Sequence, residues 1–393
     1  MNIQLCDYLD SGLGRLVIDS HGNFISFKPV EDITEFVKRI IESAAPERIN
    51  LINHLIKKND VCIRQKELGN FDIGATFSAI QSNFQLMFLI YLTTELCWDS
   101  MLNTSGDIGV ADLIAGRSQY TPYINEDIMA NIQTVQACEI GTFEDFIKNN
   151  PQFLNILVKM LSPRANKDNN DKCIHDFFQF SLAALFLHEL SHLVNPLVKT
   201  LKERQSPDSL DDIYSEEMLC DKFVYNTIIN YSVEDFSEKH KCELKKVVNK
   251  RMIGLGVFFT SIVLFGGFRN TPTHPGGYYR LSTFIYDAAS CLDYNLKPLY
   301  SALKEAEPSI IDKFGTLNLS SISMSELEKE VGPIFYKNAP ATFWNVMSSM
   351  MLLLFKLNEI QPPEASNAKD FCIKSIVALK DCTNEIATHA TST

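Results

Sequence analysis

Apolar residues recur every three or four positions along most of this chain, and this spacing is typical of helices with one buried face. The helices predicted in this way cover residues 32–45, 46–58, 84–102, 143–149, 152–161, 173–194, 294–306, 323–331, 340–360 and 365–384. Asp171 stands just before the sixth of these helices and is a suitable N-cap. Asn195-Pro196 is expected to end the same helix, because proline cannot continue the hydrogen-bond ladder.

Two short stretches near the N-terminus follow a strand pattern instead. Residues 15–19 and 24–28 alternate or are rich in β-branched and aromatic residues, and Ser-His-Gly-Asn at 20–23 between them is turn chemistry, so a hairpin is expected. Residues 76–82 predict one further strand. The expected fold class is therefore α+β, predominantly helical with a small N-terminal β component.

Two helical stretches are unusually apolar. Residues 177–187 are apolar on nearly every face, which predicts a buried helix. Residues 252–268 are apolar or small throughout, with basic residues at both ends. This run is shorter than the roughly 20 residues that a membrane span needs, and its symmetric charges give no orientation signal. A buried helix is the favoured interpretation, and a membrane span is the alternative.

Composition narrows the class of protein. Apolar residues make up 46% of the chain and charged residues 21%, which is enough for a large core. The net charge of −12 argues against nucleic acid or an anionic membrane surface as a main partner. The ten cysteines are scattered without a Cys-x-x-Cys pair, and no basic segment followed by an apolar run opens the chain. We therefore expect reduced thiols and a cytoplasmic protein.

The buried helix carries the pattern His-Glu-x-x-His at His188, Glu189 and His192. Residues four apart on a helix lie on one face about 6 Å apart, so both rings can reach one ion. Zn²⁺ accepts imidazole nitrogens at about 2.0–2.1 Å. Glu189 points about 100° away from His188 around the helix, which suits a proton acceptor better than a ligand. The pattern predicts a zinc hydrolase with Glu189 as base; a hydrogen-bonded structural cluster is the alternative.

A third ligand is expected near residues 215–221, because a catalytic zinc uses three protein ligands and leaves one position for water. In a helix, Glu217 and Asp221 share a face. Glu217 would then complete the ligand set, and Asp221 would accept the free N–H of a ligand histidine, preferably His188. Glu216 is the alternative ligand, although it leaves Asp221 without a role. Cys220 is a further candidate, but it would point away if Glu217 and Asp221 face the metal.

Together, His188-Glu189-x-x-His192 and Glu217-x-x-x-Asp221 resemble the gluzincin metallopeptidases, in which two histidines and a glutamate hold zinc. Residues 273–280, Thr-His-Pro-Gly-Gly-Tyr-Tyr-Arg, are similar to the substrate-side motif of several bacterial gluzincins, among them the phage-exclusion Lit-type peptidases. The resemblance covers residues 173–285 and implies a zincin-like catalytic core.

The same resemblance assigns further roles. It implies that His274, Tyr278 or Tyr279 stabilises the oxyanion, and that Arg280 orders the loop or holds substrate. A plain turn is the alternative for residues 274–277. A Lit-type enzyme would cleave a cytosolic host protein in phage defence, and its activity would be held in check until a trigger protein or peptide arrives.

The sequence thus predicts a zinc-dependent endopeptidase acting on a protein or peptide. Residues 1–165 are expected to form an N-terminal α+β region, 166–290 the catalytic core, and 291–393 a C-terminal helical region. Two other classes of protein stay open. One is a membrane-anchored peptidase attached through residues 252–268, and the other is a non-enzymatic regulator in which the metal only stabilises the fold.

Overall fold

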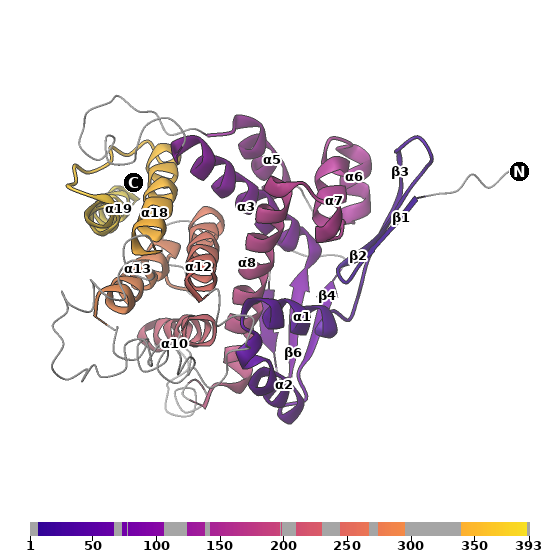
Figure 1. Ribbon diagram of the computed structural model, residues 1–393, viewed down its shortest axis with the longest axis horizontal. Helices are drawn as coiled ribbons and strands as arrows, with labels where there is room; N and C mark the ends of the chain where they lie inside the picture. Colours follow the sequence, from indigo (N-terminus) through magenta and orange to yellow (C-terminus); the bar gives the residue numbers. More distant parts are fainter. Residues whose placement is uncertain are drawn as a thin grey trace, which may run out of the picture. The chain divides into compact units, whose positions relative to one another are not determined.

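The computed structural model describes residues 7–66, 73–76, 78–105, 124–137, 142–196, 198, 210–229, 244–266, 274–294 and 339–390. Helices dominate these residues, and all of the described strands precede residue 84 (Figure 1). The expectation of a mostly helical α+β fold with small N-terminal sheets is confirmed. The predicted helices 294–306 and 323–331 lie outside the described residues, apart from residue 294.

The elements follow one another from the N-terminal sheet to the C-terminal helices. The strands are β1 Asp7–Ser11, β2 Gly14–Ile18, β3 Phe24–Pro29, β4 Cys62–Lys66, β5 Ile73–Thr76 and β6 Ala79–Asn83. The helices of the first half are α1 Thr34–Ala44, η1 Pro46–Arg48, α2 Ile49–Lys58, α3 Phe84–Ser105, α5 Glu126–Gln136, α6 Phe143–Asn149, α7 Phe153–Leu161 and η2 Arg164–Asn166. Those of the second half are α8 Asn169–Val194, α10 Leu210–Ile228, α12 Leu244–Gly266, α13 Gly277–Tyr294, α18 Ala339–Leu357 and α19 Ala368–Ala390.

The chain forms two compact units. The first unit contains residues 1–45, 49–99 and 124–224, and the second contains the remaining residues, chiefly 225–393. The division passes through helices α3 and α10. The three-part division expected from the sequence, at 1–165, 166–290 and 291–393, stays a prediction.

The predicted hairpin is present as β2 and β3, and β1 adds a third antiparallel strand in the order β1-β2-β3. The turn is held by the Asp19 carboxylate, which accepts hydrogen bonds from the backbone N–H groups of His21 and Asn23, each at 2.8 Å. Gly22 has a φ of 81°, a left-handed conformation that glycine adopts without steric cost. Local turn chemistry therefore fixes this hairpin.

The second sheet differs from the expectation of one strand at residues 76–82. This stretch is divided between two antiparallel strands, β5 and β6, and the sheet order is β4-β6-β5. No glycine or proline marks the turn between them, so the alternating pattern could not locate it. Residues 31–33 hydrogen-bond to the outer side of β4, through Ile33 N to Ile63 O and Gln65 N to Glu31 O. Among the described strands, β5 forms the opposite edge.

Helix α8 is the long apolar helix of the first unit, and it packs against α1, β5 and β6. It begins at Asn169, earlier than expected, and its N-cap is Asp168, whose carboxylate accepts from Asp171 N at 2.8 Å. The prediction of Asp171 as N-cap was wrong, because several capping residues follow one another here and only the backbone geometry selects one. The helix ends at Val194, directly before Asn195-Pro196, as predicted.

The core of the first unit contains a cluster of phenylalanines from β3, α3, α6 and α7. Phe143 is buried at its centre, with ring centroids 4.7 Å from Phe84, 5.3 Å from Phe88 and 5.5 Å from Phe27. Tilted and edge-to-face arrangements such as these are the favourable ones for aromatic rings. The cluster therefore ties the N-terminal sheet to the helices around it.

Phe143→Ala is expected to lower the free energy of unfolding by about 3–5 kcal/mol, because it removes a large buried ring and leaves a cavity. Urea unfolding followed by circular dichroism measures the change. The matched control is Ile25→Ala on β3, where the side chain is exposed and the expected change is within about 0.5 kcal/mol. An equal effect of the two substitutions would contradict this description of the core.

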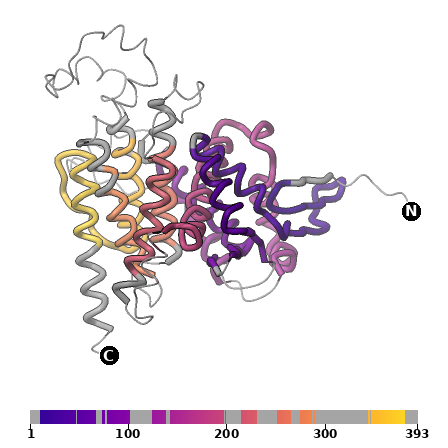
Figure 2. The backbone as a smooth tube through the Cα atoms, turned by 90° about the horizontal axis from the view of Figure 1, so that it is seen from below, coloured from indigo at the N-terminus to yellow at the C-terminus, as the bar shows by residue number. Residues whose placement is uncertain are grey.

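The second unit contains four described helices that pack on one another, α12 with α13 and α18, and α19 with α13 and α18 (Figure 2). Side chains from Met252 to Ser261 are buried, as expected of a buried helix. A Cβ atom on Gly256 would lie 2.5 Å from Met347 Sδ, so α12 and α18 approach closely because this position lacks a side chain. The predicted helices 340–360 and 365–384 correspond to α18 and α19.

Within the described residues, α8 is the one helix that meets the length and hydropathy criteria for crossing a membrane. Of its most apolar stretch of 18 residues, 78% is buried. The core helices of soluble proteins meet the same criteria, so a single helix of this kind is weak support for a span.

Candidate metal centre

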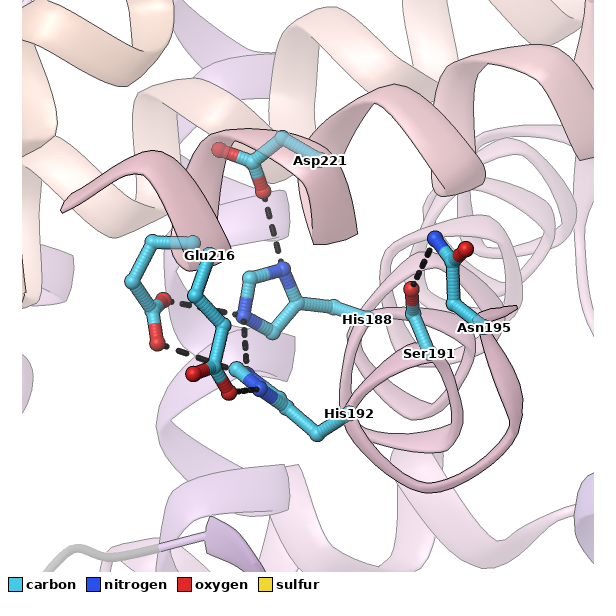
Figure 3. Close-up of polar contacts among 7 residues, drawn as sticks. His188, Ser191, His192, Asn195, Glu216 and Asp221 are labelled. Atoms are coloured by element: carbon cyan, nitrogen blue, oxygen red, sulfur yellow. Dashed lines mark hydrogen bonds and ion pairs between the residues drawn. The ribbon is translucent and has the colours of Figure 1, made fainter. Parts of the chain in front are cut away.

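Helices α8 and α10, both in the first unit at this point, present a group of titratable side chains to one another (Figure 3). They are His188 and His192 of α8, and Glu216, Glu217 and Asp221 of α10. His188 and His192 are four residues apart, as are Glu217 and Asp221, so each pair shares one face of its helix. The side chains of His188, Glu217 and Asp221 are 3%, 7% and 6% exposed, which means that this charge lies inside the protein.

The three predicted ligands come together at the centre of this group. His188 Nε2 lies 3.3 Å from His192 Nε2, and the two Glu217 oxygens lie 3.1 Å from the first nitrogen and 3.3 Å from the second. Two atoms bound to one tetrahedral zinc at about 2.0–2.1 Å lie about 3.3–3.4 Å apart. In the described part of the chain, this is the group with metal-ligating atoms all within 4.8 Å of one another. The donor set and its spacing therefore fit a metal ion.

Asp221 takes the place expected for a residue that orients a ligand. Its Oδ1 lies 2.9 Å from His188 Nδ1, on the opposite side of the ring from Glu217. An ionised carboxylate can only accept a hydrogen bond, so Asp221 favours a proton on His188 Nδ1, and this would leave the Nε2 lone pair for a metal ion at the centre of the group.

Glu216 was the alternative ligand in the sequence, and the structure places it elsewhere. Its Oε1 lies 2.6 Å from His192 Nδ1, the nitrogen that faces away from the group of three donors. It therefore does for His192 what Asp221 does for His188. The sequence offered a signal for this contact, because two ligand histidines have two free Nδ1 atoms and residues 215–221 contain three carboxylates.

Cys220 does not point away, contrary to the expectation from the sequence. Its side chain is fully buried and lies close enough to His192 to raise the pKa of that ring. Glu216 and Cys220 are four residues apart, so they form one stripe along α10 that meets His192. The sulfur is not part of the group whose ligand atoms lie within 4.8 Å. Cys220 thus contacts a predicted ligand without belonging to the donor set.

The electrostatics of the centre favour positive charge between the rings. Burial lowers the pKa of His192, but its contacts with Cys220, Glu216 and Glu217 outweigh burial and raise the pKa to about 12. In metal-free protein the imidazole of His192 is therefore protonated and positively charged. A metal ion bound by Nε2 would displace it, which is the usual coupling of metal binding to proton release.

Glu189 follows His188 on α8 and is also buried, at 6% exposed. Its carboxylate is not part of the group of three donors. Its expected role as general base stays a prediction.

The remaining predicted residues belong to the second unit. His274 is exposed, Tyr278 is half-buried, Tyr279 is exposed and Arg280 is buried. Tyr278 and Arg280 are in the first turn of α13, where the backbone N–H groups of Tyr279 and Arg280 donate to Gly276 O. These side chains therefore start from a helix and not from a loop. Their roles toward oxyanion and substrate stay predictions.

Comparison with known proteins places this centre in a family context. Residues 124–290 match the family model described as Peptidase U49, the Lit-type metallopeptidase family. The matched segment contains α8, the carboxylates of α10 and residues 274–280. No protein with a curated description and no solved structure matches the chain. The family match supports a peptidase, and the group of two histidines and a glutamate supports its dependence on a metal.

Proposed function

We propose that this protein is a zinc-dependent endopeptidase of the gluzincin type, with a zincin-like catalytic core. The observation that carries the proposal is the convergence of His188 Nε2, His192 Nε2 and the Glu217 carboxylate at tetrahedral spacing inside the protein. Two imidazoles and one carboxylate are the ligand set of several catalytic zinc sites, in which the fourth position stays open for water. The match to Peptidase U49 supports a protein or peptide as the substrate, with hydrolysis of a peptide bond as the reaction.

His188, His192 and Glu217 would hold the zinc. When bound, zinc supplies a Lewis acid for the scissile carbonyl and lowers the pKa of water toward 7. Glu189 would act as the general base that takes a proton from the attacking water and then donates it to the amine that leaves. Its burial beside the ligands supports this role, because a carboxylate screened from solvent interacts more strongly with a nearby proton.

Two further features of the site are proposed from the resemblance. His274, Tyr278 or Tyr279 would stabilise the oxyanion by donating a hydrogen bond, and Arg280 would hold substrate or the start of α13 in place. Strand β5 packs against α8 and is an edge strand among those described, so an extended substrate segment could add to it through backbone hydrogen bonds.

The biological role proposed here is phage defence. A Lit-type enzyme would cleave a cytoplasmic host protein once a trigger protein or peptide appears, and the match over residues 124–290 supports this assignment. The net charge of −12 agrees with a protein partner rather than nucleic acid.

Removal and return of the metal test the proposal. Purified wild-type protein is expected to contain about one zinc per chain by elemental mass spectrometry. Cleavage of a quenched fluorescent peptide library should disappear after dialysis against 1,10-phenanthroline and return with one equivalent of Zn²⁺. A wild-type protein that is purified without metal, or that cleaves peptides equally well after chelation, would refute a zinc peptidase. Stoichiometric zinc without cleavage, even with infected-cell extract as source of trigger, would favour the regulator.

A further inference from the structure

Each of the two histidines in the centre has its own carboxylate from α10 on the far side of its ring. Asp221 lies at His188 Nδ1, 2.9 Å away, and Glu216 lies at His192 Nδ1, 2.6 Å away (Figure 3). The second distance is shorter than the usual range of about 2.7–2.9 Å for charge-assisted N–H···O bonds. The sequence predicted the first pair and gave Glu216 no such place.

The geometry of α10 explains why one helix can supply both contacts. Glu216 and Glu217 are adjacent and point about 100° apart around the helix axis. Glu217 lies between the two Nε2 atoms, with one oxygen toward each. Glu216 is then directed past one side of the group, where the outer nitrogen of His192 lies, and Asp221, one turn further on, reaches the outer nitrogen of His188.

A carboxylate at Nδ1 has two physical effects on a metal-binding histidine. It keeps the proton on Nδ1, so that the Nε2 lone pair is available, and it fixes the orientation of the ring. It also makes Nε2 a stronger donor by polarising the N–H bond. Partners of this kind typically contribute about 10–100-fold to metal affinity.

We propose that Glu216 is a positioning residue that orients His192 for the metal and strengthens its bond to it, without itself being a ligand. Glu216 and Asp221 thereby form a matched pair, one carboxylate for each ligand histidine. This inference rests on the proposed zinc site but not on peptidase activity, and it excludes Glu216 as an alternative to Glu217.

Zinc affinity of the full-length protein tests the inference, measured by competition with a chromophoric chelator. Glu216→Gln retains the size of the side chain and removes the charge, and it is expected to weaken zinc binding about 10-fold. Glu216→Ala removes the contact and should weaken binding up to about 100-fold. Glu216→Asp keeps the charge on a shorter side chain and should lie between wild type and alanine. Glu42→Gln on α1 is the matched control. Glu42 is exposed, so the zinc affinity of this variant should equal that of wild type.

The ligand shell gives a second measurement, which separates a residue that orients His192 from one that binds the metal. In Glu216→Gln, X-ray absorption of the zinc-loaded protein should still show two imidazole ligands and an unchanged number of oxygen and nitrogen neighbours. The melting temperature of the metal-free variants is expected to stay near that of wild type, which separates altered affinity from unfolding. If Glu216→Gln does not fold, Glu216→Asp supports the same comparison.

Two results would overturn the inference. If Glu216→Gln and Glu216→Ala bind zinc as tightly as wild type does, His192 needs no carboxylate partner and the inference fails. The proposed function would remain intact in that case, because wild type would still bind zinc. A loss as complete as that of Glu217→Ala, together with one fewer oxygen neighbour, would make Glu216 a ligand. A wild type that binds no zinc would instead refute the proposed function.

Discussion

Glu217→Ala is expected to abolish stoichiometric zinc binding while the protein stays folded. Glu217 lies between His188 Nε2 and His192 Nε2 and supplies the carboxylate of the group of three. Its loss leaves two imidazoles, and two ligands from one turn of helix hold zinc far more weakly than three. We expect a loss of affinity larger than the roughly 10–100-fold that an outer carboxylate contributes.

Elemental mass spectrometry after dialysis measures this loss, with wild type near one zinc per chain and the variant close to zero. Far-ultraviolet circular dichroism checks that the helices persist. Glu42→Ala is the control, because it removes an exposed glutamate from a helix of the same unit and should retain its zinc. A Glu217→Ala protein that keeps one zinc per chain would show that the ligand set is wrong.

Glu189→Gln is expected to retain zinc and lose peptide cleavage by about 10²–10⁴-fold, the usual contribution of a general acid–base group. Glutamine has almost the same shape as glutamate, so the buried position next to His188 stays filled. It cannot accept the proton from water, and it cannot donate one to the leaving amine. Zinc content and the cleavage rate of the fluorescent peptide library, measured on the same preparation, separate binding from chemistry.

The same variant separates an enzyme from a regulator. If the metal only stabilises the fold, Glu189→Gln should keep zinc, stability and the biological effect together. Glu42→Gln is the matched control for the change of charge, and it should cleave peptides at the wild-type rate. Cleavage by Glu189→Gln at that same rate would remove Glu189 from the reaction.

Several parts of the fold followed from local sequence alone. The hairpin of β2 and β3 was predictable because Asp19, Gly22 and Asn23 form a turn whose hydrogen bonds are within the turn itself. The end of α8 at Val194 was predictable because Pro196 cannot continue a helix. The turn between β5 and β6 was not predictable, because it depends on pairing between strands and carries no glycine or proline.

For the candidate site, the sequence by itself determined the metal-binding face of α8 and the face of α10 that meets it. Helix periodicity brings His188 over His192 and Glu217 over Asp221 wherever these segments are helical. Only the tertiary structure decided how the two faces are matched. Glu217 as a ligand and Asp221 at His188 were expected from the sequence, with Glu216 as the alternative ligand. That Glu216 instead lies at His192 Nδ1, and that Cys220 lies against His192, depends on the rotation and offset of α10 against α8, which packing between the helices sets.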